Sequence, residues 1–174
     1  MRVIAGTLKG RRLQGPRDDR VRPTSDRLRE TLFNVLGDTI RGARVFDGFG
    51  GTAAVAIEAI SRGAAAARVC ERSPDALRVA RANIEACGVG NVVQLDRGDF
   101  FLIRPEAAYD LVFLDPPYDD INLDDVVRHG AGHVAPEGKL VLEHQKSRPS
   151  PETAGELMRV RVLQAGDSAL SFYR

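Results

Sequence analysis

The sequence contains no tryptophan and only two cysteines, Cys70 and Cys87, and aromatic residues make up just 6% of its 174 residues. The two cysteines are expected to be reduced thiols in core positions, as in a cytoplasmic protein. No apolar run approaches the length of a membrane-spanning helix, and Met1–Ile4 lack the apolar core of a signal peptide. With 43% hydrophobic residues, the chain suits one compact domain of ordinary size.

The net charge is only +1, but the charge is distributed unevenly. Residues 1–44 contain eleven Lys or Arg against five Asp or Glu, a balance of +6, so the remaining residues carry −5. Because sequence-independent affinity for nucleic acid comes mainly from Lys and Arg, this basic front end predicts contact with phosphates. The alternative is a solvated hairpin with scattered arginines. The candidate contacts are Lys9, Arg11, Arg12 and Arg22, together with Thr24 in the turn that Arg22 begins.

The most informative motif is Asp115-Pro116-Pro117-Tyr118, which follows the apolar run 109–114. Two consecutive prolines fix the backbone and remove two N–H donors, so the turn is rigid and presents carbonyl oxygens between an acid and an aromatic ring. Asp115 and the Pro116 carbonyl can accept both hydrogens of a flat amine, and Tyr118 offers a face for stacking the attached heterocycle. An ordinary strand followed by an Asp-Pro turn is the alternative, and a second constellation upstream favours a nucleobase site.

That second constellation is a strand, a glycine loop and a helix in succession. The strand 43–47 ends in Asp47, the helical pattern covers 53–60, and between them lies the loop Gly48, Phe49, Gly50, Gly51 and Thr52. Glycines let the backbone turn tightly and approach a ligand, and the free N–H groups of the following helix point at whatever binds there. A glycine loop alone is a weak signal, and the spacing of the acids that follow strengthens it.

Acidic residues end the next two predicted strands. Glu71 ends the strand 66–71, 24 residues after Asp47, where a carboxylate accepts the hydroxyls of a ribose in nucleotide-binding α/β units. Asp99 follows the strand 91–95 and is placed to accept from an adenine amine, with Phe100 packed near the ring. All of these candidates fall at carboxyl ends of strands, where open α/β sheets bind their ligands.

In these motifs the sequence resembles the S-adenosylmethionine-dependent methyltransferases with a Rossmann-like sheet, and within them the bacterial 16S ribosomal RNA guanine-N2 methyltransferases of the small-subunit rRNA methyltransferase D family. The resemblance covers nearly the whole chain, through the segments 2–6, 9–13, 22–24, 32–37, 47–52, 113–118 and 166–173.

The resemblance implies methyl transfer from S-adenosylmethionine to the exocyclic N2 amine of a guanine in 16S rRNA, within the small ribosomal subunit or its precursor. It also implies a monomer whose chemistry needs no metal. The implied catalytic residues are Asp115, Pro116, Pro117 and Tyr118, and the implied cofactor-binding residues are Asp47, Gly48, Phe49, Gly50, Gly51, Thr52, Glu71, Asp99 and Phe100.

The chain departs from the family pattern at one position of the cofactor loop. Where the family's Asp-x-Phe-x-Gly-Ser/Thr-Gly motif ends in glycine, this sequence has Ala53. An alanine tolerates the start of a helix but is expected to avoid a positive φ, so the loop is predicted to follow a slightly different path.

The expected organisation is an α/β protein with a mostly parallel sheet. Residues 1–22 form a basic N-terminal β-hairpin that contacts RNA, and residues 23–174 form the catalytic domain. Helices are predicted from Pro23 to Gly37, from Ser73 to Gly88 and over 121–133, and strands over 109–114 and 139–143. The segments 158–163 and 169–173 alternate in strand fashion and predict a closing antiparallel pair.

Three histidines suggest a metal site only weakly. His129 and His133 have helical i, i+4 spacing, but no Glu lies between them at the metalloprotease position, so they and His144 are interpreted as ordinary surface residues.

Two rival functions remain open at this point. DNA adenine amino-methyltransferases share the Asp-Pro-Pro-Tyr motif, although 174 residues leave no room for their usual target-recognition region. A catalytically silent RNA-binding or assembly factor on the same fold is the second, because a fold does not guarantee a function.

Overall fold

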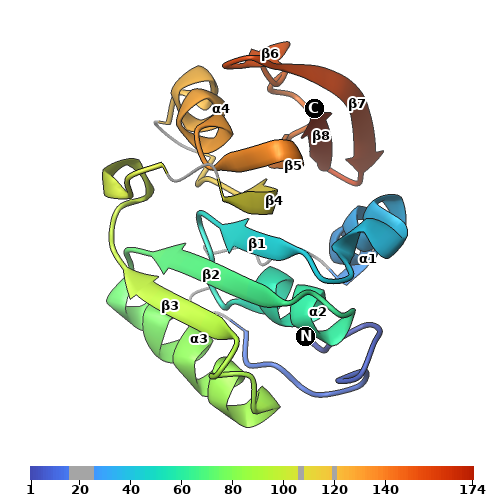
Figure 1. Ribbon diagram of the computed structural model, residues 1–174, viewed down its shortest axis with the longest axis vertical. Coiled ribbons are helices and arrows are strands. Elements are labelled where there is room, and N and C mark those ends of the chain that lie inside the picture. Colours follow the sequence, from blue (N-terminus) through green and yellow to red (C-terminus); the bar gives the residue numbers. More distant parts are fainter. Residues whose placement is uncertain (16–25, 106–107, 119–120) are drawn as a thin grey trace.

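Figure 1 shows the computed structural model, which describes residues 1–15, 26–105, 108–118 and 121–174. In these residues the strands form one sheet in the order β3-β2-β1-β4-β5-β8-β7-β6. Neighbouring strands from β3 to β5 run parallel, and β8, β7 and β6 are added antiparallel. The predicted class, a mostly parallel α/β sheet with an antiparallel C-terminal end, is confirmed.

The described strands are β1 (Arg44–Asp47), β2 (Ala66–Glu71), β3 (Val93–Arg97), β4 (Tyr109–Leu114), β5 (Val134–Gln145), β6 (Thr153–Ala154), β7 (Leu157–Ala165) and β8 (Ser168–Tyr173). The described helices are α1 (Asp26–Leu36), α2 (Ala54–Ser61), α3 (Pro74–Cys87) and α4 (Leu123–Ala131), with 3-10 turns η1 (Gly37–Ile40) and η2 (Phe100–Leu102). None of these helices is long and apolar enough to cross a membrane.

Two hydrophobic cores lie on opposite faces of the sheet. Successive side chains of a strand point to opposite faces, and in β1 Val45 belongs to one core and Phe46 to the other. The core of Val45 includes side chains of α1, α2 and α3, and the core of Phe46 includes side chains of α4 and η2. The parallel part of the sheet is therefore covered on both faces, and its carboxyl edge is where such sheets bind ligands.

Most elements lie within a few residues of their predicted bounds. Helix α3 begins after Ser73, whose Oγ accepts from the backbone N–H of Ala76 at 3.4 Å, and it ends before Gly88 at φ +69°. Strand β5 starts at Val134, five residues before the predicted start at residue 139. The predicted strand began too late because Pro136 and Glu137 interrupt the apolar pattern of this segment. The short β6 was not predicted.

Within the described part of the predicted N-terminal β-hairpin, one isolated pair, Arg2 with Arg12, forms a β-bridge in place of regular strands. The backbone N–H groups of Ile4 and Ala5 donate instead to the carboxylate of Glu58 on α2, at 2.8 and 3.0 Å. Regular pairing stops there because these donors have a better acceptor than the opposite strand.

Glu58 fixes this hairpin onto the body of the protein. Its side chain is fully buried and forms ion pairs with Arg62 at 2.7 Å and with the buried Arg29 at 3.7 Å. Val3 and Leu13 of the hairpin are buried in the same core as α2. The division of the chain at residue 22 stays a prediction, and residues 16–22 lie outside the described part.

Candidate active site

The candidate site lies where the strand order reverses. From β1 the chain passes to β2 on one side, and it later returns from β3 to β4 on the other side of β1. A crevice for ligands forms at the carboxyl ends of the strands at such a switch point. Asp47 ends β1 and Asp115 follows β4, and the charge of Asp115 acts on the Asp47 carboxyl group. The structure thus brings the two predicted halves of the site together.

The glycine loop that follows β1 forms hydrogen bonds with both neighbouring strands, β4 and β2. The N–H of Gly48 donates to the carbonyl of Phe113 at 3.0 Å, and the N–H of Gly50 donates to that of Cys70 at 2.9 Å. A Cβ on Gly50 would lie 2.0 Å from Cγ1 of Val69, so this glycine is required for packing against β2. Gly51 has φ +51°, and a Cβ placed there would meet open space. Of these glycines, Gly51 offers the open side that a ligand needs.

Ala53 adopts the conformation that an alanine was expected to avoid. Its φ is 61° and its ψ is 20°, in the left-handed region, and its side chain is fully buried. The Ala53 N–H donates to the carbonyl of Gly50 at 2.7 Å, and its carbonyl accepts from Ile57 at 2.9 Å. The expectation is therefore wrong: these two bonds hold a conformation that costs an L-residue roughly 1–2 kcal/mol.

Glu71 ties the glycine loop to the end of β2. Its Oε2 accepts from the backbone N–H of Gly51 at 2.9 Å, and its Oε1 accepts from the N–H of Ser73 at 2.7 Å. Each carboxylate oxygen has two lone pairs, so both can still accept a hydroxyl group. Glu71 is half-buried and its position is fixed by backbone donors.

Asp47 is the most perturbed acid of the site. Burial raises the pKa of Asp47 to about 8, the charges of Asp115 and Glu71 add to the increase, and a hydrogen bond from the Phe49 N–H opposes it. Its Oδ1 is buried without a hydrogen-bond partner among the described residues. A buried acceptor of this kind fits a ligand that brings a donor or a positive charge.

Asp99 and Phe100 hold the structure of η2. The Asp99 carboxylate accepts from the Phe101 N–H at 2.9 Å and caps this turn. Phe100 is 2% exposed and lies 4.8 Å from the ring of Phe49 and 6.2 Å from that of Phe46, measured between centroids. The structure thus places Phe100 below the surface of the site, and the exposed ring of this turn is Phe101.

The Asp-Pro-Pro-Tyr turn is fixed by residues from the antiparallel end of the sheet. Tyr118 Oη lies 3.0 Å from Ser168 Oγ, and the guanidinium of Arg148 donates to the Tyr118 carbonyl at 3.1 Å and to the Ile121 carbonyl. Asp115 and Tyr118 are half-buried. Sequence reasoning missed Arg148, because nothing near it in the chain marks a contact 30 residues away.

Three of the predicted RNA contacts lie away from this edge of the sheet. Lys9, Arg11 and Arg12 are exposed, and Arg22 and Thr24 lie outside the described residues. The hairpin binds the carboxyl ends of α2 and α3, through Thr7 N–H to the Ser61 carbonyl and Arg11 Nη1 to the Ala86 carbonyl. Because α2 leads to the amino end of β2, the hairpin tip lies near the tails of the strand arrows in Figure 1, opposite the site.

Asn83 of α3 joins this hairpin to the cofactor loop. Its side chain is 1% exposed, its Nδ2 donates to the carbonyls of Gln14 at 3.1 Å and Thr52 at 3.0 Å, and its Oδ1 accepts from the Gln14 N–H at 2.8 Å. Sequence reasoning missed it. The available signal was a polar residue on the buried stripe of α3, which contains Val79, Ala80, Ile84 and Cys87.

Two of the three histidines are not surface residues, and His129 is half-buried. His133 is fully buried, with its ring centroid 4.7 Å from that of Phe46, and burial lowers its pKa to about 4. His144 is 4% exposed and its Nε2 lies 2.9 Å from Ser171 Oγ. The surface interpretation is wrong for both, because these rings pack into the core beside aromatic and hydroxyl groups. Among the described residues no group of acids, histidines and cysteines could hold a metal ion.

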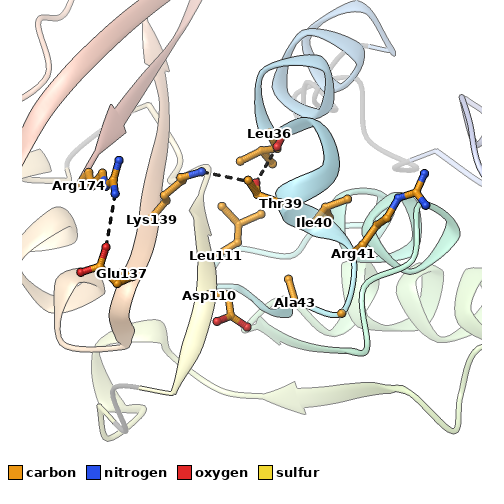
Figure 2. Close-up of a pocket in the computed structure, with 11 residues that line it drawn as sticks. Leu36, Thr39, Ile40, Arg41, Ala43, Asp110, Leu111, Glu137, Lys139 and Arg174 are labelled. Carbon is orange, nitrogen blue, oxygen red and sulfur yellow. Dashed lines mark hydrogen bonds and ion pairs between the residues drawn. The ribbon is translucent and has the colours of Figure 1, made fainter.

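A groove of about 490 Å³ lies at the opposite edge of the sheet, at the amino ends of β1 and β4 (Figure 2). Its charged groups are engaged within the protein. Glu137 pairs with Arg174 at 3.4 Å, Asp110 Oδ2 accepts from the Arg44 N–H at 2.7 Å, and Lys139 Nζ lies 3.5 Å from Thr39 Oγ1. None of the predicted site residues lines this groove.

Comparisons with known proteins identify the family of the chain. A family model described as Conserved hypothetical protein 95 matches residues 1–174. The Ribosomal RNA small subunit methyltransferase D of Escherichia coli strain K12 is 30% identical over 177 residues, covering 100% of this chain and 89% of that protein. The chain belongs to the ribosomal RNA small subunit methyltransferase D family.

Solved structures have a fold similar to that of this methyltransferase D family member. The structure of yhhF from Escherichia coli has a TM-score of 0.86 at 28% identity and covers 99% of this chain and 96% of that one. An RNA methyltransferase from Salinibacter ruber, solved in complex with S-adenosyl-L-homocysteine, has a TM-score of 0.67 at 17% identity, covering 87% of this chain and 92% of that one. At that identity the likeness concerns the fold alone.

Proposed function

We propose that the protein transfers a methyl group from S-adenosylmethionine to the exocyclic N2 amine of a guanine in 16S rRNA, acting as a monomer on the small ribosomal subunit or its precursor. The observation that carries this proposal is the meeting of Asp47 and the Asp-Pro-Pro-Tyr turn at the switch point of the sheet. Membership of the methyltransferase D family supports the choice of ribosomal RNA.

The cofactor would be held by the residues around the glycine loop. Asp47 offers a buried oxygen without a partner in the described chain, Gly51 offers open space, and Glu71 offers acceptors for the ribose hydroxyls. Thr52 belongs to the same loop. Asp99 follows β3 and precedes Phe100, whose ring packs against Phe49 of the loop. These residues fit the group. S-adenosylmethionine supplies a methyl group that its sulfonium charge already activates.

The amine would be oriented by the turn after β4. Asp115 and the Pro116 carbonyl accept its two hydrogens, and the base stacks on Tyr118 after extrusion from an RNA loop. Two fixed acceptors orient a nitrogen lone pair that is otherwise delocalised into the ring, and they bind more strongly as the nitrogen becomes positive. When the nitrogen has bonded to the methyl carbon, the S–C bond is broken and S-adenosylhomocysteine is left. The cationic nitrogen would then lose one proton to Asp115 or to water.

One experiment separates this function from its rivals. We would measure transfer of radiolabelled methyl from the cofactor to 30S particles, naked 16S RNA and DNA. Label in either RNA substrate, located at guanine N2, supports the proposal. Label in DNA alone would indicate a DNA amino-methyltransferase, and RNA binding without any transfer would indicate a silent assembly factor.

Cofactor binding is expected to release a proton from Asp47 at pH 7. Because the pKa of Asp47 is raised to about 8, its carboxyl group is largely protonated in the free protein, and a cation bound beside it favours ionisation. Affinity should therefore rise between pH 6 and 8. The stability of the fold changes in the opposite direction. Asp47 ionises at a lower pH in the unfolded chain than in the folded protein, so its contribution to the free energy of unfolding falls as pH rises toward 8.

Calorimetry in two buffers of different ionisation enthalpy measures that proton. Asp47→Asn is the control, since it removes the titrating group but keeps a polar side chain, and it separates Asp47 from the amino group of the cofactor. Equal proton release by the variant and the wild type would exclude Asp47 as the source.

The basic hairpin is expected to contribute part of the RNA affinity. Neutralising Lys9, Arg11 and Arg12 together to glutamine should reduce the slope of log K against log salt by about 0.7 to 0.9 per lost phosphate contact. Deletion of the hairpin is a poorer test, because it would leave the buried Glu58 without the N–H groups of Ile4 and Ala5. An unchanged slope in filter binding would make the hairpin a structural element.

A further inference from the structure

The turn η2 presents two apolar side chains to solvent beside the candidate site. Leu102 is 84% exposed and Phe101 is 39% exposed, whereas Phe100 between them and the core is 2% exposed. The turn follows β3 at the carboxyl edge of the sheet, next to Asp99. Apolar groups held at the rim of a binding crevice mark an interaction surface more often than isolated apolar residues elsewhere.

The exposure of Leu102 is built into a fixed turn. The Leu102 N–H donates to the Asp99 carbonyl at 3.0 Å, and the Ile103 N–H donates to that of Phe100 at 3.2 Å. His129 Nε2 lies 3.1 Å from the Ile103 carbonyl, and the Phe101 ring packs against His129 at 5.6 Å between centroids. The turn is therefore fixed by its own backbone hydrogen bonds and by the contacts with His129, and these hold the Leu102 side chain in solvent.

Three exposed arginines lie close to this turn in the chain or at the end of the neighbouring strand. Arg97 precedes it, Arg104 follows it, and Arg72 follows the neighbouring strand β2. None of the three forms an ion pair within the described residues. Of the acids at these two strand ends, Asp96 pairs with Arg68 at 2.5 Å and Asp75 pairs with Arg78, whereas Asp99 and Glu71 accept hydrogen bonds from backbone N–H groups.

We propose that η2 and its flanking arginines form an RNA-docking element, in which Phe101 and Leu102 contact an unstacked base near the target guanine and Arg72, Arg97 and Arg104 contact phosphates. Single-stranded RNA is bound by aromatic side chains on which bases stack, combined with a positively charged surface that follows the phosphates. The positive rim favours RNA over a protein partner with a neutral surface. This inference rests on the proposed function, since it takes RNA as the substrate of the same site.

The test compares two double variants with the same chemical change. Leu102→Ala with Arg104→Gln removes one exposed apolar side chain and one cation at η2. Val160→Ala with Arg161→Gln removes the same two kinds of group on β7, where Val160 is 63% exposed and Arg161 is also exposed. Filter binding with naked 16S RNA over a range of salt concentrations gives the affinity and the salt slope, and calorimetry gives the Kd of S-adenosylhomocysteine.

The η2 variant is expected to bind RNA about tenfold more weakly, with a salt slope reduced by about 0.7 to 0.9, and to keep its cofactor affinity. When Arg97→Gln and then Arg72→Gln are added to the η2 variant, each replacement should reduce the salt slope by a further similar amount. The β7 variant should bind RNA like the wild type.

Wild-type RNA affinity in the η2 variant would overturn the inference while leaving the proposed function intact, provided that the wild type methylates RNA. A loss of cofactor affinity without a loss of RNA affinity would also overturn it, since η2 would then serve the adenine. Failure of the wild type to methylate any RNA would instead refute the proposed function.

Discussion

Replacement of Asp115 by alanine is expected to lower turnover by about 10²- to 10³-fold and to leave the Kd of the cofactor nearly unchanged. Asp115 lies at the switch point beside Asp47, and the following prolines hold its backbone rigid. Its proposed partner is the substrate amine, so its loss removes an acceptor that strengthens as the nitrogen becomes positive. Asp115→Asn keeps one acceptor oxygen and should retain more activity than the alanine variant.

Asp110→Ala is the matched control for this prediction. Asp110 belongs to the same strand but lies at its amino end, where its carboxylate accepts from the Arg44 N–H in the groove of Figure 2. Single-turnover methylation and calorimetry with the cofactor give the two readouts. Near wild-type methylation by Asp115→Ala would remove Asp115 from the role of amine acceptor. Asp115→Asn should also lower the pKa of Asp47, since the charge of Asp115 contributes to its increase.

The parts of the site that the sequence predicted are those encoded by neighbouring residues. Strand ends are visible as apolar runs that stop at an acid, and parallel strands bring their carboxyl ends to one edge, so Asp47, Glu71 and Asp115 could be placed together without a structure. The partners of Arg148 and Asn83 were not predictable, because each side chain joins segments that are distant in sequence; for Asn83 the pattern of α3 marks only that a polar residue is buried.

The glycine loop shows a second limit of sequence reasoning. A glycine signals that a Cβ does not fit, but the sequence does not say what occupies the space. At Gly50 the neighbour is Val69 of the protein itself, and at Gly51 the space is open. Ala53 shows the converse, because two backbone hydrogen bonds hold an alanine at a positive φ that its intrinsic preference opposes.

Charge asymmetry along the chain was likewise an incomplete guide to RNA contact. It singled out the hairpin, whose tip lies at the amino edge of the sheet. The arginines around η2 stand in an acidic part of the chain and leave no such signal in the sequence. They become visible only in the structure, where the neighbouring acids are seen to have other partners.

Loss of Glu71 is expected to weaken cofactor binding roughly ten- to a hundredfold, since hydrogen bonds to a charged acceptor contribute about 1.5 to 3 kcal/mol. The structure adds a second cause to the proposed ribose contact. Glu71→Ala also leaves the N–H groups of Gly51 and Ser73 without their acceptor, which loosens the glycine loop. The size of the effect alone therefore does not assign Glu71 to the ribose.

A cofactor analogue separates these two causes. We would measure by calorimetry the Kd of S-adenosylhomocysteine and of its 2′,3′-dideoxy analogue for the wild type and for Glu71→Ala. If Glu71 accepts from the ribose hydroxyls, the wild type should prefer the natural compound about tenfold or more, and the variant should lose most of that preference. An action through the loop alone would weaken both compounds equally and preserve the preference. In that case Glu71 would be a positioning residue for Gly51, and another side chain of the site would have to bind the ribose.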